Sequence, residues 1–249
     1  MNFSDATILI TGGNSGIGRG LAEALAVRGA KIIITGRDKD RLDEVVRANP
    51  GMTAYELDVT SVSDIETLAG KLVIEHPDLN AVIHNAGILP YENVLADHYD
   101  MEIVEKVFLT NVMGPLRLTG ALLPHLRRKP DAAIITVSSG LAFVPLAKAS
   151  AYSASKAAIH SWSQSIRHEL RDTHISVVEI VPPLVATELT PGQSQNPHAM
   201  PLDAFIDETV GLMCAEPTPD EVLVHRVLPQ RTAEQAGVFE KVFGLINPS

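Results

Sequence analysis

A glycine-rich segment near the start of the chain most constrains its fold. The apolar run 6–10 leads into residues 11–18, and a stretch with helical spacing, 21–25, follows. Glycines let a backbone turn tightly and approach a pyrophosphate, while free N–H groups at a helix start face the anion. Such a turn also closes ordinary hairpins, but its place between a strand and a helix predicts a dinucleotide site. The expected contacts are Gly12, Asn14, Ser15, Gly16, Ile17 and Gly18.

Short β-branched runs recur along the chain, separated by longer stretches with helical spacing. Apolar strands that do not alternate with polar residues are typical of a parallel sheet covered by helices on both faces. The pattern predicts an α/β Rossmann fold, a single domain over residues 1–249 with a doubly wound sheet of about seven strands. Asp38 and Ser61 are expected to cap the second and third helices. The recognisable strands are 8–10, 32–34, 54–57, 81–83, 134–137 and 177–181.

Charge and cysteine content restrict the partners of this 249-residue chain. Its 30 acidic and 20 basic residues give a net charge of −10, and an acidic surface repels phosphate backbones, so we expect no nucleic-acid partner. The single cysteine, Cys214, excludes an internal disulfide, suits a reducing cytosol and is interpreted as a small core residue. Without cysteine pairs or a tight histidine cluster, we expect no metal site.

Neither a signal peptide nor a membrane-spanning run is recognisable. Residues 1–5 lack a cationic start and a long apolar stretch. Segment 175–186 comes closest to a membrane span, but Glu179 and two prolines interrupt it, and a span needs about 18 apolar residues. These features predict a soluble cytoplasmic protein with no membrane partner.

A tyrosine and a lysine stand four residues apart in a stretch with helical spacing. Tyr152 and Lys156 therefore share a helix face. A phenol with a pKa near 10 is a poor acid–base catalyst at neutral pH, but a nearby ammonium favours the phenolate and lowers that pKa. The pair predicts acid–base chemistry, although an exposed Tyr–Lys pair on a helix surface has the same spacing.

Two further polar residues complete a set. Ser139 follows the strand 134–137, and Asn111 lies earlier in the chain. With them the chain resembles the single-domain branch of the short-chain dehydrogenases/reductases over nearly its whole length. The motifs of this family occur in the same order as in its members. The combination is specific for the family, although each motif on its own is not. The motifs are residues 11–18, Asp58, residues 85–87, Asn111, Ser139, Tyr152 and Lys156.

The resemblance implies a role for each polar side chain. Ser139 would orient a substrate carbonyl, and Tyr152 would donate a proton to it during reduction or accept one during oxidation. Lys156 would hold the nicotinamide ribose, and Asn111 would anchor a water that relays protons. The implied activity is NADP(H)-dependent interconversion of a ketone or aldehyde and an alcohol, since the cofactor carries the hydride. The sequence does not specify the substrate.

The end of the second strand bears on the choice of cofactor. An acidic residue there would bind the ribose of NAD, but this chain has Gly36, and Arg37 is placed to contact the phosphate of NADP. Asp38 is interpreted as a helix cap, and Ser15 replaces a basic residue that many NADP-binding relatives carry. NADP(H) is therefore favoured over NAD(H). Further cofactor contacts are expected at Arg37, Asp58, Val59, Asn85, Ala86, Gly87, Tyr152, Lys156, Pro182, Val185 and Thr187.

Some positions depart from the family pattern. His84 stands where relatives commonly have asparagine and is interpreted as a strand-end packing residue, and Pro183 replaces a glycine. The Pro-Pro sequence resembles a subgroup named DltE, after an operon concerned with D-alanylation of cell-wall polymers. A nicotinamide-binding regulatory protein without turnover and a D-alanylation accessory protein are therefore the alternatives to an enzyme. His160, His168 and His174 are expected on helix surfaces.

Three expectations concern the surroundings of the site. The irregular segment 189–205 is interpreted as a substrate lid, with a plain surface connection as the alternative. Apolar residues in the fourth and fifth helices permit a homodimer or homotetramer, and internal packing would use them equally well. An apolar wall of the substrate pocket is expected at Leu141, Phe143, Val144 and Leu146.

Overall fold

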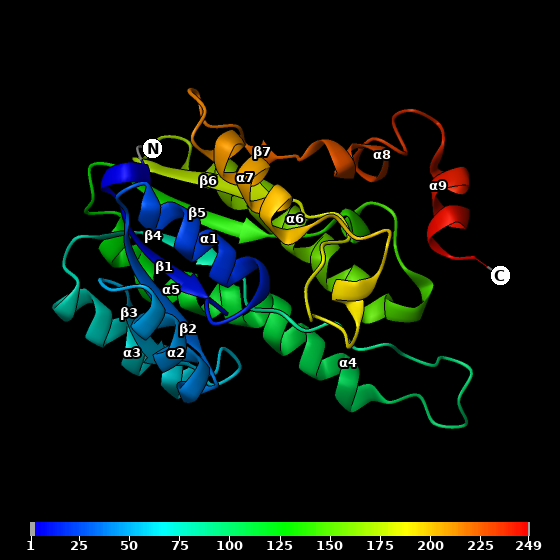
Figure 1. Ribbon diagram of the computed structural model, residues 1–249, viewed down its shortest axis with the longest axis horizontal. Helices are drawn as coiled ribbons and strands as arrows, with labels where there is room; N and C mark the ends of the chain where they lie inside the picture. The colour runs from blue at the N-terminus through cyan, green and yellow to red at the C-terminus, as the bar shows by residue number, and fades with distance from the viewer. Residues whose placement is uncertain (1–2, 249) are drawn as a thin grey trace.

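The computed structural model describes residues 3–248 and contains a parallel sheet of seven strands. The strand order is β3-β2-β1-β4-β5-β6-β7, and each neighbouring pair is parallel. Figure 1 shows the sheet enclosed between helices. The α/β Rossmann prediction is confirmed. The strands are β1 (Thr7–Thr11), β2 (Lys31–Gly36), β3 (Thr53–Glu56), β4 (Leu79–His84), β5 (Ala132–Val137), β6 (Ile175–Ile180) and β7 (Glu221–Val222).

Helices connect these strands. Short 3-10 segments are η1 (Phe3–Asp5), η3 (Gly140–Ala142), η4 (Ala147–Ala149), η5 (Gln193–Gln195) and η6 (His225–Val227), while η2 (Leu109–Met113) is a π-helix. The α-helices are α1 (Gly16–Val27), α2 (Lys39–Ala48), α3 (Val62–Glu75), α4 (Met101–Phe108), α5 (Gly114–Leu126), α6 (Ser150–Leu170), α7 (Leu202–Met213), α8 (Leu228–Arg231) and α9 (Phe239–Ile246).

Local sequence accounts for where these elements begin. The side chain of Asp38 accepts a hydrogen bond from Arg41 N at 3.1 Å and caps α2, as predicted. Ser61 caps α3 in the same way, accepting from Asp64 N at 3.2 Å. Every residue of β1 and β5 is buried, which explains their uninterrupted apolar sequences.

Two apolar layers cover the sheet. One face packs against α1, α2 and α7, and the other packs against α3, α5 and α6. The strand order reverses between β1 and β4, so the connections from these two strands leave to opposite sides. In such sheets, ligands bind at this reversal, beyond the carboxyl ends of the strands.

The structure corrects some local predictions. Helix α7 begins at Leu202, so the last residues of the expected lid 189–205 are helical. Cys214 follows α7 and is exposed, whereas Met213 beside it is buried; the chain leaves the core one residue earlier than predicted. Strand β7 has only two residues, too few for a recognisable apolar run. Within residues 3–248, no helix has the length and apolar character that a bilayer crossing requires.

Candidate active site

The glycine-rich turn joins β1 to α1 at the reversal of strand order. Gly12 and Gly16 have φ values of 66° and 51°, a left-handed conformation that a side chain would disfavour. A Cβ atom at Gly18 would lie 2.3 Å from the carbonyl oxygen of Gly12, so the absence of a side chain lets α1 pack against the turn. The turn therefore has the tight conformation between strand and helix that the sequence predicts.

The end of β4 holds the turn in place. Thr11 Oγ1 accepts hydrogen bonds from the backbone N–H groups of Asn85 and Ala86, both at 3.1 Å. Asn85 Nδ2 donates to the carbonyl oxygens of Thr11 at 2.9 Å and Gly12 at 3.2 Å. Asn85 thus fixes the shape of the turn in addition to lining the space beside it.

A cleft of about 1300 Å³ extends from this turn past the carboxyl ends of the strands. All the predicted cofactor contacts line this cleft, with the exception of Gly18. Ser139 lines it as well. A cleft of this volume, lined by a tight glycine turn and by cationic side chains, fits a dinucleotide. Further lining residues that the sequence did not single out include Arg41, Lys106, Ile88, Leu89, Pro90, Gln193 and Leu202.

Ser139, Tyr152 and Lys156 meet in the cleft from two elements. Tyr152 and Lys156 lie in the first two turns of α6 and are 6% and 5% exposed. Ser139 follows β5, accepts from Leu141 N at 3.1 Å, and its hydroxyl hydrogen-bonds that of Tyr152. The shared helix face of Tyr152 and Lys156 is observed as predicted.

The electrostatics of Tyr152 differ from the expectation. Burial raises the pKa of Tyr152 to about 12, and the hydrogen bond with Ser139 opposes this only in part. Lys156 Nζ lies 5.5 Å from the centroid of the Tyr152 ring and donates to the carbonyl oxygen of Val137 at 2.7 Å. Burial also lowers the pKa of Lys156 to about 8. Desolvation therefore outweighs the effect of the ammonium that the sequence argument relied on.

Asn111 lies behind the cleft in the π-helix η2. Its Oδ1 accepts from Ile88 N at 2.9 Å, and its Nδ2 donates to Ile88 O and to Ser155 Oγ, both at 3.0 Å. Ser155 in turn donates to the carbonyl oxygen of Tyr152 at 2.7 Å. Asn111 is only 1% exposed and does not line the cleft, but it connects the segment after β4 to α6.

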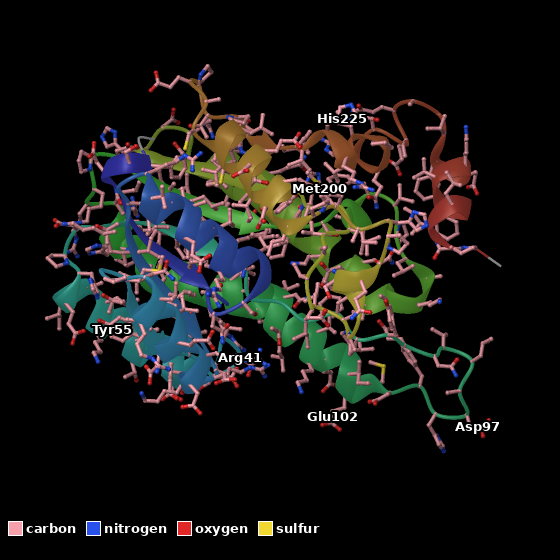
Figure 2. The ribbon with its side chains drawn as sticks, viewed as in Figure 1. Arg41, Tyr55, Asp97, Glu102, Met200 and His225 are labelled. Carbon is pink, nitrogen blue, oxygen red and sulfur yellow. The ribbon has the colours of Figure 1, made fainter. Side chains whose placement is uncertain are left out.

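Arg37 and Arg41 line the end of the cleft beyond β2. Arg41 Nε lies 3.3 Å from a carboxylate oxygen of Asp38, the residue that caps α2. Figure 2 shows Arg41 on α2. A Cβ atom at Gly36 would lie 2.9 Å from the amide group of the Asn14 side chain, so a larger residue there would displace that side chain. The sequence did not indicate Arg41, because only the packing of α2 beside β2 brings this residue to the cleft.

The segment after β6 forms another wall. Pro182, Val185 and Thr187 line the cleft as predicted, together with Leu189. Gln193 Nε2 donates to the carbonyl oxygen of Val185 at 2.8 Å. A parallel bridge between Val185 and Met200 returns the segment to its starting point, so residues 189–201 form a folded loop beside the cleft.

The expected apolar wall lies elsewhere. Val144 is fully buried in the protein, and the Phe143 ring packs between His160 and Arg231, at centroid distances of 4.6 and 4.7 Å. None of Leu141, Phe143, Val144 and Leu146 lines the cleft. Beyond the predicted cofactor contacts, its apolar lining includes Ile88, Leu89, Pro90, Leu189 and Leu202.

His84 packs at the end of β4, as interpreted from the sequence. It is 4% exposed, and its Nε2 lies 2.7 Å from Thr119 Oγ1. Burial lowers the pKa of His84 to about 3, so the ring is neutral near pH 7.

A carboxylate absent from the predictions supports the start of α6. Glu92 accepts from Ala151 N and Ser150 Oγ, both at 2.8 Å, beside Tyr152. Glu92 belongs to the irregular segment between β4 and α4, whose outer end, at Asp97, extends away from the sheet in Figure 2. The contact joins residues far apart in sequence, and no local pattern indicates it.

Comparisons with known proteins agree with this geometry. Residues 6–198 match the family model described as short chain dehydrogenase. The uncharacterized oxidoreductase DltE of Bacillus subtilis is 40% identical over 196 residues, covering 76% of this chain and 75% of that protein. A short chain dehydrogenase from Burkholderia cenocepacia in complex with NADP is 28% identical, with TM-score 0.83 and 100% of both chains covered. One from Sphingobium yanoikuyae in complex with NADPH is 25% identical, with TM-score 0.80 and 97% and 95% covered.

Proposed function

Because the chain belongs to the short-chain dehydrogenases, we propose that this oxidoreductase interconverts a carbonyl compound and an alcohol, with Tyr152 as the general acid and base. The observation that supports the proposal most is the meeting of Ser139, Tyr152 and Lys156 in one cleft with the glycine-rich turn. A bound nicotinamide would supply or accept the hydride. The alternatives without turnover have no comparable support, since they do not require these three side chains together.

Each side chain has a defined task in this proposal. During reduction, the Tyr152 hydroxyl donates its proton to the substrate oxygen while Ser139 donates a hydrogen bond to the same oxygen. During oxidation, Tyr152 takes the proton back. Lys156 holds the nicotinamide ribose and stabilises the phenolate that forms when Tyr152 has given up its proton. The pKa of about 12 matches a group that stays protonated until a better base than water develops beside it.

Asn111 has a positioning task, because it does not line the cleft. Its hydrogen bonds to Ile88 and Ser155 fix the distance between the segment after β4 and the helix that carries Tyr152. We infer that the π-helical turn η2 directs the Asn111 amide into the protein, toward Ile88 and Ser155. The proton relay behind Lys156 would begin there.

We infer a preference for NADP(H) over NAD(H). Two guanidinium groups, of Arg37 and Arg41, line the cleft beyond β2 and would bind a ribose phosphate. Gly36, at the end of β2, offers no carboxylate that would hold an unphosphorylated ribose. The NADP and NADPH named for two of the similar solved structures agree with this choice.

The substrate in this proposal is an apolar carbonyl compound under a folded lid. Ile88, Leu89, Pro90 and Leu189 give the cleft near Tyr152 an apolar lining. The lid is the loop 189–201, which Gln193 ties to Val185. We also expect a homodimer or homotetramer. Leu109 and Met113 are 38% and 36% exposed at the two ends of η2, which joins the helices where we expect the contact, and light scattering of the purified chain tests this.

Consumption of NADPH and NADH over a panel of aldehydes, ketones and quinones tests the function. We expect turnover with NADPH that falls by about 10²- to 10⁴-fold in Tyr152→Phe, with NADPH binding retained. Tyr55→Phe is the matched control, because Tyr55 OH bonds Glu75 and His76 outside the cleft. Turnover at the wild-type rate in Tyr152→Phe would overturn the assignment.

A further inference from the structure

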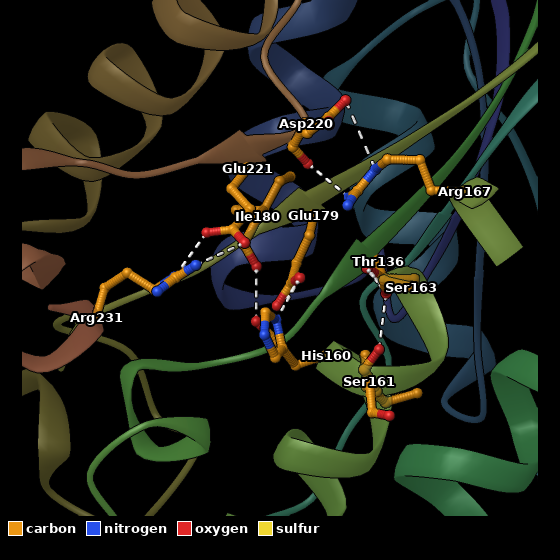
Figure 3. Close-up of polar contacts among 12 residues, drawn as sticks. Thr136, His160, Ser161, Ser163, Arg167, Glu179, Ile180, Asp220, Glu221 and Arg231 are labelled. Atoms are coloured by element: carbon orange, nitrogen blue, oxygen red, sulfur yellow. Dashed lines mark hydrogen bonds and ion pairs between the residues drawn. The ribbon is translucent and has the colours of Figure 1, made fainter. Parts of the chain in front are cut away.

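A buried carboxylate lies beneath the helix that carries Tyr152 and Lys156. Glu179, on β6, is 0% exposed, and its Oε2 lies 2.8 Å from His160 Nδ1 on α6 (Figure 3). Its Oε1 has no hydrogen-bond partner among residues 3–248. His160 was expected on the helix surface, but the side chain turns inward to meet this carboxylate.

Charged groups from three elements surround Glu179. His160 on α6 contacts it directly, and Lys156 lies one turn earlier on the same helix. Lys156 Nζ donates to the carbonyl oxygen of Val137, the residue that follows the register neighbour of Glu179 on β5, and the two opposite charges attract each other. Glu221 is its register neighbour on β7, but Arg231 on α8 holds both Glu221 oxygens, at 2.6 and 3.0 Å. Arg231 therefore pairs with Glu221 and also attracts Glu179 electrostatically, so Glu179 has two cations near it, Arg231 and Lys156, in addition to its contact with His160.

Packing alone does not call for a carboxylate at this position. The same face of β6 carries Val177, and the register neighbour of Glu179 on β5 is Thr136, whose hydroxyl bonds Ser163 on α6 at 2.8 Å. Apolar or neutral polar residues thus join α6 to the sheet on either side. Because a buried charge with one unpaired oxygen costs stability, its presence points to a role beyond packing.

We propose that Glu179 is a positioning residue for Lys156, whose buried ammonium it keeps charged. The proposal rests on the proposed function, in which that ammonium holds the nicotinamide ribose. Glu179 touches neither the cleft nor a reacting atom, so it acts only through Lys156.

Burial and the charge of Glu179 act in opposite directions on the protonation of Lys156. Burial lowers the pKa of Lys156 to about 8, and the negative charge of Glu179 opposes that shift. Without Glu179 the pKa would be lower still, and much of the lysine would be neutral at pH 7 to 8. A neutral amine would hold the ribose less well and would not stabilise a phenolate.

A double-mutant cycle on the free energy of unfolding tests the interaction without cofactor. Glu179→Gln keeps the shape and removes the charge, and Lys156→Met removes the ammonium. We expect Glu179→Gln to lower the free energy of unfolding more in the wild type than in Lys156→Met. In the wild type the substitution leaves the buried Lys156 ammonium without this negative charge, whereas Lys156→Met has no ammonium there. Ser163→Ala, which breaks the neighbouring neutral contact, should cost the same in both backgrounds. Equal cost of Glu179→Gln in both would overturn the proposal.

The pH dependence of NADPH affinity tests the consequence. Affinity should fall above the pKa of Lys156, and in Glu179→Gln the midpoint should move down by about one pH unit. Ser163→Ala should keep the wild-type midpoint. An unmoved midpoint in Glu179→Gln would overturn the proposal even if stability changed. A wild-type chain that binds no nicotinamide would overturn the proposed function instead, and the cycle would still decide whether the two charges interact.

Discussion

Thr11 and Thr35 are register partners on β1 and β2, yet their hydroxyl groups have opposite surroundings. Thr11 Oγ1 accepts from the N–H groups of Asn85 and Ala86 and donates to Ile83 O at 3.4 Å. Thr35 Oγ1 is buried and has no hydrogen-bond partner among the described residues. One threonine therefore anchors the glycine-rich turn, whereas its neighbour carries a polar atom that the fold does not use.

Replacing each threonine by the isosteric valine should give opposite results. Thr11→Val leaves the Ala86 amide without an acceptor, so we expect a loss of about 1–3 kcal/mol in the free energy of unfolding. Thr35→Val removes an unpaired buried hydroxyl and should be neutral or stabilising by about 1 kcal/mol. Urea denaturation of the two variants measures both, and equal losses would show that the Thr11 contacts do not anchor the turn.

The cationic end of the cleft predicts a change in cofactor choice. Arg37→Ala and Arg41→Ala should each lower kcat/KM for NADPH by about 10- to 100-fold, because each removes a charge-assisted hydrogen bond, and should leave NADH unaffected. Arg47→Ala is the control, since Arg47 lies on the same helix and bonds only Asp43 O. A loss shared equally by both cofactors would mean that the arginines support the fold instead of the phosphate.

Sequence alone predicts the parts of this site that are local in the chain. The glycine-rich turn, the caps at Asp38 and Ser61, and the shared face of Tyr152 and Lys156 depend on spacing within a few residues. These are the scales on which propensity and periodicity act, so the corresponding predictions are confirmed.

The contacts that sequence misses join distant segments. Glu92 reaches the start of α6 across 59 positions, and Glu179 meets His160 only because α6 covers β6. The raised pKa of Tyr152 has the same origin, since it depends on how completely the surrounding chain excludes water. A short sequence motif specifies neither how deeply a side chain is buried nor which helix packs against which strand.

Replacing Asn111 by aspartate should destabilise the protein more than the same replacement at Asn93. Asn111→Asp keeps the acceptor for Ile88 N but loses the two donors, to Ile88 O and Ser155 Oγ, so we expect a loss of about 1–3 kcal/mol. Asn93→Asp is the matched control, because Asn93 only accepts, from Leu95 N at 3.1 Å. Thermal unfolding of the two variants gives the comparison, and equal stabilities would refute the positioning role of the Asn111 amide.

Buried His84 predicts a stability that falls with acidity. The pKa of His84 is about 3 in the folded protein, against about 6.5 in an unfolded chain. Between these values the unfolded state binds more protons, so stability rises with pH and is lost as the pH falls below about 6.5. The slope from this one residue approaches about 1.4 kcal/mol per pH unit. Burial also lowers the pKa of His125, which adds a contribution of the same sign.

Unfolding free energies between pH 7 and pH 4.5 measure this slope. His84→Gln keeps a polar group toward Thr119 and does not titrate, so its stability should fall less steeply than that of the wild type. Gln164→Asn, a non-titrating substitution at an exposed position on α6, is the control and should keep the wild-type slope. If His84→Gln followed the wild-type curve, the ring would have to escape protonation in the unfolded chain or accept a proton inside the fold. The second outcome is incompatible with this structure, because His84 is 4% exposed and its side chain contacts the neutral hydroxyl of Thr119, so an imidazolium there would be a buried charge with no ion-pair partner among the described residues.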